Sequence, residues 1–383
     1  MRFHLFASVS ASSALVVIAG SLTAPPVRAQ TTDPKAIVAE LGLQESAKPV
    51  RELPGWRAPK KIVILAFTAA QVARLQAAAP GVELVAAAAS RNDPSIAAGA
   101  DAIIGPCLPA FIAASKDVRW MHSLSAGVED CVSMPAIRER NILLTNMQHV
   151  SAATIGEHGV ALMLALTRRL DSYVRQQSQG SWAPLGRSAV VSGQASNAMP
   201  VINGKTALVV GLGGIGTEFA KRAHALGMKV IATRNSGRTG PEFVSYVGGP
   251  DELLTLAKDA DVIFSALPLT PATTDLLDAK FFSVLKPSAY LINVGRGKTI
   301  VTSALIDALN TGKLAGAGLD VTEPEPLPAD HPLWKAPNLI ITPHVAARSD
   351  LPPDKSWAVV YEQIRRYAAG EKMLSVVDLE RGY

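Results

Sequence analysis

The stretch from Lys205 to Arg238 constrains the fold more than any other part of the chain. An apolar run, Thr206–Val210, leads into the sequence GLGGIG at 211–216, and a helical pattern then precedes a second apolar run at 230–233. Strand, glycine turn, helix and strand is the order in which G-x-G-x-x-G binds a dinucleotide. The N–H groups that open the helix then face the pyrophosphate. The alternative is a glycine-rich turn that binds no ligand.

Each glycine of this turn has a physical reason to be there. Gly211 permits the tight turn, Gly213 lets the backbone approach a pyrophosphate, and Gly216 lets the helix pack close to the strand. We therefore expect the cofactor to contact the whole turn, namely Gly211, Gly213, Gly214, Ile215 and Gly216.

The residues that follow the second apolar run indicate which dinucleotide binds. NAD-binding proteins carry a carboxylate about 20 residues past the glycines, where it holds the ribose hydroxyls. The segment 233–238 reads TRNSGR and contains no acid. Arg234 would pair with a 2′-phosphate through its planar set of donors, which favours NADP over NAD, although NAD stays possible. The alternative is that Arg234 covers the adenine or points to solvent.

The first 29 residues differ from the rest of the chain. Arg2 precedes a run of Ala, Ser, Val, Leu and Ile from Leu5 to Leu22, and Val27-Arg28-Ala29 offers a cleavage point. This pattern is typical of a secretory signal peptide, so residues 1–29 predict export to the periplasm; an uncleaved membrane anchor is the alternative. No later apolar run could cross a bilayer, so we expect no membrane span once the signal is removed.

Composition excludes several other classes of protein. The length of 383 residues suits two domains, and the basic residues, at a net charge of +5, occur as isolated pairs without a stripe of aromatics, so nucleic-acid binding is not expected. No metal site is expected.

Two cysteines, Cys107 and Cys131, are too few for a disulfide framework. We expect them to be free, with a single bridge as the alternative in an exported protein.

Apolar runs that alternate with helical patterns predict two α/β domains with parallel sheets. The first alternation begins at Lys61 and ends near Asn146, and the second surrounds the glycine turn. Residues 30–57 look like a tether with one short helix, Pro34–Leu41, and a long helix is expected from Ser151 to about Gln177.

Three polar segments follow strands of the second domain, where ligands bind in such sheets. They contain Arg296, Glu325 and His344. Arg296 would hold a substrate carboxylate and polarise its carbonyl, while His344 would donate a proton to the carbonyl oxygen as hydride arrives from the nicotinamide. Glu325 would hydrogen-bond the imidazole. Singly each residue also has a purely structural explanation, but together they predict hydride transfer to a keto acid.

Six motifs in order carry a resemblance to a known family. They are GLGGIG, LPLTPAT (267–273), NVGRG (293–297), GLDVTEPEPLP (318–328), HPLW (331–334) and TPH (342–344). Together with SAGVED (125–130), they resemble the D-isomer-specific 2-hydroxyacid dehydrogenases over nearly all of 58–383. The resemblance implies an NAD(P)-dependent enzyme of the glyoxylate/hydroxypyruvate reductase type that acts on a small 2-keto or 2-hydroxy acid as a homodimer.

The resemblance also implies a domain organisation. A Rossmann nucleotide domain, 156–344, is inserted in a flavodoxin-like substrate domain formed by 58–155 and 345–383, and both are doubly wound parallel-sheet α/β units. Proteins of this family are normally cytoplasmic, which conflicts with the expected signal peptide.

Site residues can be assigned from the motifs that match. The resemblance implies Arg296, Glu325 and His344 as the catalytic set, with Arg296 also binding substrate. Backbone amides of Ser125, Ala126 and Gly127 would hold the substrate carboxylate. Further cofactor contacts are implied for Leu267, Pro268, Thr273, Val294 and Asp320, the last at the nicotinamide carboxamide.

A second function remains open at this point. A protein of this fold outside the cytoplasm could be a catalytically silent binder of a dinucleotide or an organic acid. A pure binder has no use for a proton donor paired with a carboxylate, so Arg296, Glu325 and His344 favour the enzyme.

Overall fold

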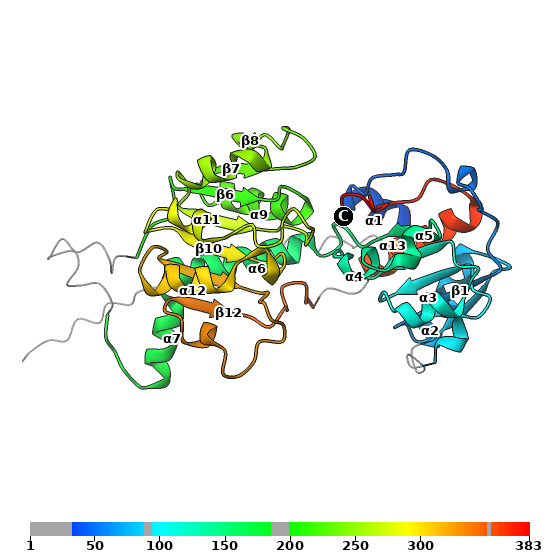
Figure 1. Ribbon diagram of the computed structural model, residues 1–383, viewed down its shortest axis with the longest axis horizontal. Coiled ribbons are helices and arrows are strands. Elements are labelled where there is room, and N and C mark those ends of the chain that lie inside the picture. The colour runs from blue at the N-terminus through cyan, green and yellow to red at the C-terminus, as the bar shows by residue number, and fades with distance from the viewer. Residues whose placement is uncertain (1–32, 88–92, 185–198, 351–353) are drawn as a thin grey trace, which may run out of the picture.

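The computed structural model describes residues 33–87, 93–184, 199–350 and 354–383. The expected signal peptide lies outside these ranges. Within them, no helix has the length and apolar character needed to span a membrane. The described chain forms two α/β lobes that lie side by side (Figure 1).

The first lobe contains a five-stranded parallel sheet in the order β2-β1-β3-β4-β5. This is the flavodoxin-like order. Its strands are β1 (Lys61–Ile64), β2 (Glu83–Ala86), β3 (Ala102–Gly105), β4 (Trp120–Ser123) and β5 (Leu143–Thr145).

The second lobe contains a seven-stranded parallel sheet in the order β12-β11-β10-β9-β6-β7-β8. Counted from β6, this is the Rossmann order 3-2-1-4-5-6 with one more strand, so the expected fold class is confirmed. Its strands are β6 (Thr206–Val210), β7 (Lys229–Thr233), β8 (Tyr246–Gly248), β9 (Val262–Ser265), β10 (Tyr290–Asn293), β11 (Gly316–Leu319) and β12 (Leu339–Ile341). Strands β6 and β7 match the apolar runs at 206–210 and 230–233, and the short β8 was not predicted.

Helices cover both faces of each sheet, because strands buried on both sides need apolar cover above and below. Around the first sheet lie α1 (Pro34–Leu41), α2 (Ala69–Leu75), α3 (Pro109–Ala114), α4 (Glu129–Val132), α5 (Pro135–Glu139) and α13 (Asp354–Ala369). Around the second lie α6 (Ala152–Thr167), α7 (Leu170–Ser178), α9 (Gly214–Ala225), α10 (Leu253–Ala257), α11 (Ala279–Ser283) and α12 (Thr302–Asn310). Short 3-10 turns occur at Val50–Glu52, Gln76–Ala78, Pro94–Ala97, Pro250–Glu252, Gly297–Thr299 and Pro332–Lys335.

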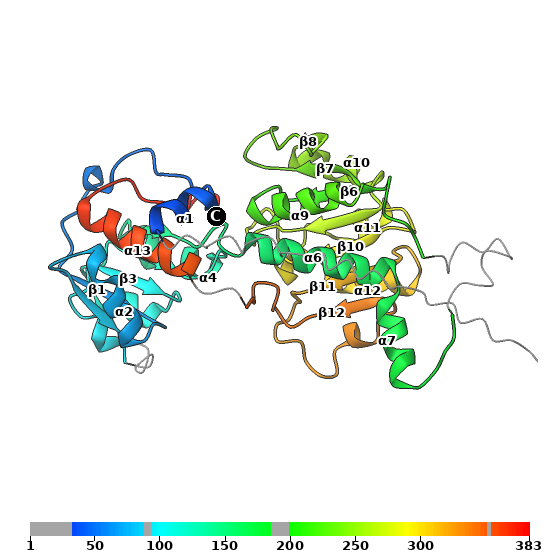
Figure 2. The same ribbon diagram turned by 180° about the vertical axis from the view of Figure 1, so that it is seen from behind.

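Helix α6 lies against the second sheet beside α9 (Figure 2). Two glycines allow this close packing. A Cβ at Gly156 would meet the backbone nitrogen of Phe219 at 2.9 Å, and one at Gly159 would collide with the ring of Phe264. Phe219 and Phe264 stack with ring centroids 3.9 Å apart in the core between α6, α9 and the sheet.

The segment expected to be a tether is instead part of the first lobe. Helix α1 has the predicted bounds, but Ile37, Leu41 and Val50 are buried in the same apolar cluster as residues of α13. Three apolar side chains spaced along a short polar segment give a weak periodic signal, and their burial depends on α13, which lies more than 300 residues away in sequence. The tether prediction was therefore wrong for residues 34–52.

The long helix expected from Ser151 to about Gln177 is broken. Helix α6 ends at Thr167, and Arg169 has a left-handed backbone (φ 56°) before α7 begins. The apolar pattern alone did not reveal this break.

Candidate active site

The glycine turn has the geometry that a dinucleotide needs. Gly211 has φ 96°, and the N–H groups of Gly211 and Leu212 both donate to the carbonyl of Thr233 at the end of β7. At Gly216 an added Cβ would collide with the carbonyl oxygen of Gly211, so the helix can approach the strand only with glycine there. At Gly213 an added Cβ would meet nothing within 4 Å, which leaves room at the amino end of α9 for an anion.

Arg234 lies directly after β7, beside this turn. Its Nε donates to the hydroxyl of Ser236 (2.8 Å) and its Nη1 to the carbonyl of Thr239 (3.2 Å). Its Nη2 has no hydrogen-bond partner among the described residues. The side chain is therefore held in place with one terminal nitrogen free to bind a ligand.

The second lobe brings its three polar segments to the same edge of the sheet. Strands β10, β11 and β12 are parallel neighbours, and Arg296, Asp320 and His344 follow their carboxyl ends. The hydrogen bond between His344 and Glu325 that the sequence led us to expect is present, from Nδ1 to Oε1 at 2.5 Å. Both side chains are about half exposed, so the Nε2 side of the imidazole can reach solvent or substrate.

Asp320 holds the segment that carries His344. Its buried carboxylate accepts hydrogen bonds from the Thr342 hydroxyl (2.6 Å) and the N–H groups of Val345 and Ala346 (both 3.0 Å), and its carbonyl accepts the N–H of His344 (2.8 Å). These bonds stabilise the left-handed backbone of His344 (φ 52°). The carboxylate therefore has a structural task besides the cofactor contact implied by the resemblance.

His158 of α6 completes this cluster. Its Nε2 lies 2.9 Å from the Thr342 hydroxyl and 3.5 Å from Oδ1 of Asp320. No role was predicted for His158 from the sequence. Its spacing along α6 gives no hint of Thr342, which lies 184 residues away.

Arg296 reaches across to the first lobe. Its Nε donates to Glu129 Oε1 (2.5 Å) and its Nη1 to the carbonyl of Gly295 (2.8 Å). Its Nη2 lies against Gly127, where a Cβ would collide with it. The substrate loop inferred from Ser125, Ala126 and Gly127 and the arginine inferred to bind substrate are thus in direct contact. Glu129 was not predicted as a site residue.

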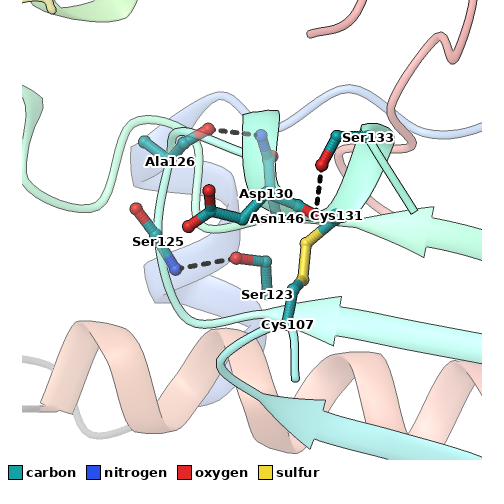
Figure 3. Close-up of a disulfide and its surroundings, with 8 residues drawn as sticks. All are labelled: Cys107, Ser123, Ser125, Ala126, Asp130, Cys131, Ser133 and Asn146. Atoms are coloured by element: carbon teal, nitrogen blue, oxygen red, sulfur yellow. Dashed lines mark hydrogen bonds between the residues drawn. A yellow bond between two sulfur atoms is a disulfide. The ribbon is translucent and has the colours of Figure 1, made fainter. Parts of the chain in front are cut away.

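The substrate loop is held by its own neighbours (Figure 3). The amide of Asn146 donates to the carbonyl of Ala126 (2.8 Å), and the N–H of Ser125 donates to the Ser123 hydroxyl (3.2 Å). No hydrogen bond within the described residues joins the Arg296–Glu129 pair to the His344–Glu325 pair.

The expectation of free cysteines was wrong. Cys107, in the segment after β3, and Cys131, on α4, form a disulfide with Cα atoms 5.2 Å apart (Figure 3). The residues are 24 positions apart, and they meet because β3 and β4 are adjacent strands, which spacing in the sequence does not reveal.

The other predicted cofactor residues lie in the segments that follow β9 and β10. Leu267 contacts the position that a Gly211 side chain would occupy, and its backbone lies against Gly295, one residue from Arg296. The Thr273 hydroxyl donates to the carbonyl of Pro268 (2.6 Å), which closes the loop after β9. Val294 is buried directly after β10. No group of His, Cys, Asp and Glu within the described ranges could hold a metal ion.

A Rossmann sheet with this turn, beside a rim that carries arginine, histidine and carboxylate, defines an NAD(P)-dependent dehydrogenase. The model of the D-isomer specific 2-hydroxyacid dehydrogenase NAD-binding domain matches residues 160–346. Glyoxylate/hydroxypyruvate reductase A of Photorhabdus laumondii is 32% identical over 281 residues, which cover 71% of this chain and 84% of that protein.

Solved structures agree with this match. The NADPH-dependent glyoxylate/hydroxypyruvate reductase of Sinorhizobium meliloti in complex with NADP and sulfate has 27% identity and a TM-score of 0.71, covering 85% of this chain and all of that one. A D-isomer specific 2-hydroxyacid dehydrogenase family protein from Aeromonas salmonicida has 32% identity and a TM-score of 0.71, covering 84% and 99%. The chain belongs to the family of D-isomer specific 2-hydroxyacid dehydrogenases.

Proposed function

We propose that this protein reduces a small 2-keto acid of the glyoxylate or hydroxypyruvate type to the D-2-hydroxy acid. The observation that carries the proposal is the His344–Glu325 hydrogen bond at the sheet edge that also bears Arg296. A histidine whose Nδ1 is held by a carboxylate presents Nε2 for proton transfer. The reductases of this type among the relatives support the substrate class.

The chemistry follows from these side chains. A bound dihydronicotinamide supplies the hydride to the carbonyl carbon. His344, in its charged form, donates a proton from Nε2 to the carbonyl oxygen, and Glu325 stabilises the imidazolium through Nδ1. Arg296 polarises the carbonyl and binds the carboxylate together with backbone amides of Ser125, Ala126 and Gly127. Oxidation of the hydroxy acid requires the neutral imidazole instead.

We propose NADP as the preferred cofactor. The free Nη2 of Arg234 beside the glycine turn supports this choice, and several structural neighbours are complexes with NADP or NADPH. Replacing Arg234 with Asp should shift preference towards NAD. If the ratio of NADPH to NADH turnover is unchanged, Arg234 does not bind the 2′-phosphate.

Residues 58–155 with 345–383 would act as the substrate domain and 156–344 as the nucleotide domain. Export of the protein is also part of the proposal, because a disulfide is typical of oxidising compartments and supports the signal peptide expected at 1–29. Fractionation of cells that express the full chain tests this point. Recovery of the intact chain only with the cytoplasm would refute export.

Initial rates with NADPH and NADH test the function directly. Protein from Gln30 onward would be assayed with glyoxylate, hydroxypyruvate, pyruvate, phenylpyruvate and 2-ketoglutarate. We expect turnover of the smaller acids, faster with NADPH. Replacing His344 with Ala should abolish most turnover, by about 10²-fold or more, while cofactor fluorescence still reports binding.

Full activity of the His344→Ala variant would show that His344 is not the proton donor. No turnover with any acid, together with intact cofactor binding, would favour the alternative of a silent binding protein. Replacing His331 with Ala is the matched control, because that histidine accepts the Leu333 N–H at a turn away from the rim.

A further inference from the structure

The segment Asp378–Tyr383 is folded onto the first lobe as a fixed loop. The chain runs beside β5, where the Val377 N–H donates to the carbonyl of Leu144 (2.9 Å). Oδ1 of Asp378 then accepts the N–H groups of Glu380 (2.9 Å) and Arg381 (3.1 Å).

The same loop is fastened from outside by α5. Arg138 donates to the carboxylate of Glu380 (2.8 Å) and to the carbonyl of Leu379. Within the loop, the Gly382 N–H donates to the carbonyl of Asp378 (2.8 Å). The position of Tyr383 is therefore set by the first lobe.

The far side of this loop touches the second lobe. Asn235 donates from Nδ2 to the hydroxyl of Tyr383 (2.9 Å), and a Cβ on Gly382 would lie 3.4 Å from the methyl group of Thr270. Figures 1 and 2 both place this end of the chain on the side of the first lobe that faces the second. Asn235 is the neighbour of Arg234, and Thr270 belongs to the loop 267–273.

These two contacts lie on segments that are expected to contact the cofactor: the one that carries Arg234 and the loop 267–273. Within the second lobe, the N–H of Arg234 donates to the carbonyl of Gly248 (3.0 Å), and Arg238 pairs with Asp251 and Glu252. The side chain of Arg234 bonds only to Ser236 and Thr239 among the described residues, and Asn235 is exposed. Among the described residues, the hydrogen bond from Asn235 to the Tyr383 hydroxyl is the one that joins this segment to the first lobe.

We propose that Tyr383 is a positioning residue for cofactor selection. By holding Asn235, it keeps the neighbouring Arg234 in the conformation that presents Nη2 to a 2′-phosphate. The substrate lobe thereby contributes to discrimination between NADP and NAD. This inference rests on the proposed role of Arg234.

Replacing Tyr383 with Phe removes the hydroxyl and leaves the ring. Dissociation constants for NADPH and NADH would be measured by cofactor fluorescence, which needs no turnover, together with the KM of both cofactors and of the keto acid. We expect NADPH to bind about fivefold more weakly, as for the loss of one hydrogen bond, with NADH and keto-acid values unchanged. Asn235→Ala should give the same result, and the double variant should be no worse than either single one.

Replacing Tyr361 of α13 with Phe is the matched control, since that tyrosine packs on Trp357 of its own helix. Equal weakening for NADPH and NADH would show a merely structural role, and unchanged or tighter NADPH binding would show that the contact does not select the cofactor. Each result would overturn the inference. If Arg234→Asp leaves the ratio of the two cofactors unchanged, the proposed cofactor preference fails first. If Arg234→Asp changes the ratio and Tyr383→Phe does not, only this inference fails.

Discussion

The carboxylate of Glu129 pairs with Arg296, the arginine that would bind substrate in the proposed mechanism. The Nε of Arg296 is 2.5 Å from Glu129, Nη1 is taken by the carbonyl of Gly295, and Nη2 lies against Gly127. A substrate carboxylate therefore competes with Glu129 for the same guanidinium.

Replacing Glu129 with Gln should lower the KM for the keto acid about fivefold and leave kcat unchanged, because the competing charge contributes about 1 kcal/mol in a partly exposed pair. Steady-state rates with NADPH measure both values. Asp130→Asn, on the next residue of α4, is the control. A higher KM in Glu129→Gln would show that Glu129 orients the arginine for substrate.

His122 is a buried histidine whose protonation opposes folding. Burial lowers its pKa from 6.5 to about 3, and its Nδ1 is 2.8 Å from the Thr145 hydroxyl, which also accepts a hydrogen bond from Trp120. In the unfolded chain this histidine binds a proton near pH 6.5. The neutral form thus stabilises the fold fully above pH 6.5, and that stability is lost as the pH falls towards 3.

We expect the free energy of unfolding to fall with a contribution of about 1.4 kcal/mol per pH unit from this one group between pH 6 and 4. Denaturant titrations of the wild type and of His122→Gln at several pH values measure it. The variant should be less stable at pH 7 but show a shallower decline. If the free energy of unfolding falls equally steeply with pH in both proteins, groups other than His122 cause the loss of stability in acid.

At the scale of single residues, the sequence predicted the contacts that are determined by short motifs. The glycine turn and the His344–Glu325 contact follow from strand ends and short-range order, and both are present. Glu129 and Tyr383 could not be predicted, since their partners belong to the other lobe and depend on how the two lobes meet.

Among the elements, α6 is the one whose packing depends on the absence of side chains. In an exposed helix Gly→Ala would stabilise by about 1 kcal/mol. At Gly156 the new methyl group would lie 2.9 Å from the backbone nitrogen of Phe219, where neither helix can yield without moving. Gly156→Ala should therefore destabilise the protein by about 1–3 kcal/mol.

Thermal unfolding of Gly156→Ala measures this effect, with Glu157→Ala on the exposed side of the same helix as control. A raised melting temperature for Gly156→Ala would mean that α6 and α9 are not held this closely.

The apolar pattern predicted that α6 is a helix, but its break at Arg169 and its contact with α9 depend on tertiary packing.

On the scale of the whole molecule, helix α7 leaves apolar side chains uncovered. Leu170 and Val174 on α7, and Trp182 four residues after its end, are half to almost fully exposed, and no residue of α7 is buried. Such a surface is typical of an interface. It supports the homodimer that the family resemblance implies, with the nucleotide lobe as the site of association.

Light scattering coupled to size exclusion should give twice the mass of the chain. Val174→Ser with Trp182→Ser should shift the mass towards that of one chain, whereas Val201→Ser, also exposed but shortly before β6, should not. A monomeric wild type would contradict the homodimer.

The two-lobe architecture was largely predictable, because alternating apolar runs and helical patterns specify parallel sheets. The contribution of residues 34–52 to the first lobe was not, since it depends on α13 at the other end of the described chain.

The bridge between Cys107 and Cys131 has a practical consequence. Cys131 is two residues from Glu129 on the same short helix, so the bridge restrains the carboxylate that faces Arg296. Dithiothreitol, often added to protect dehydrogenases during purification, would release α4 from the segment after β3. Batches prepared with and without a thiol reagent should then differ in keto-acid affinity. Rates measured on different samples can therefore be compared only when the samples have the same disulfide content.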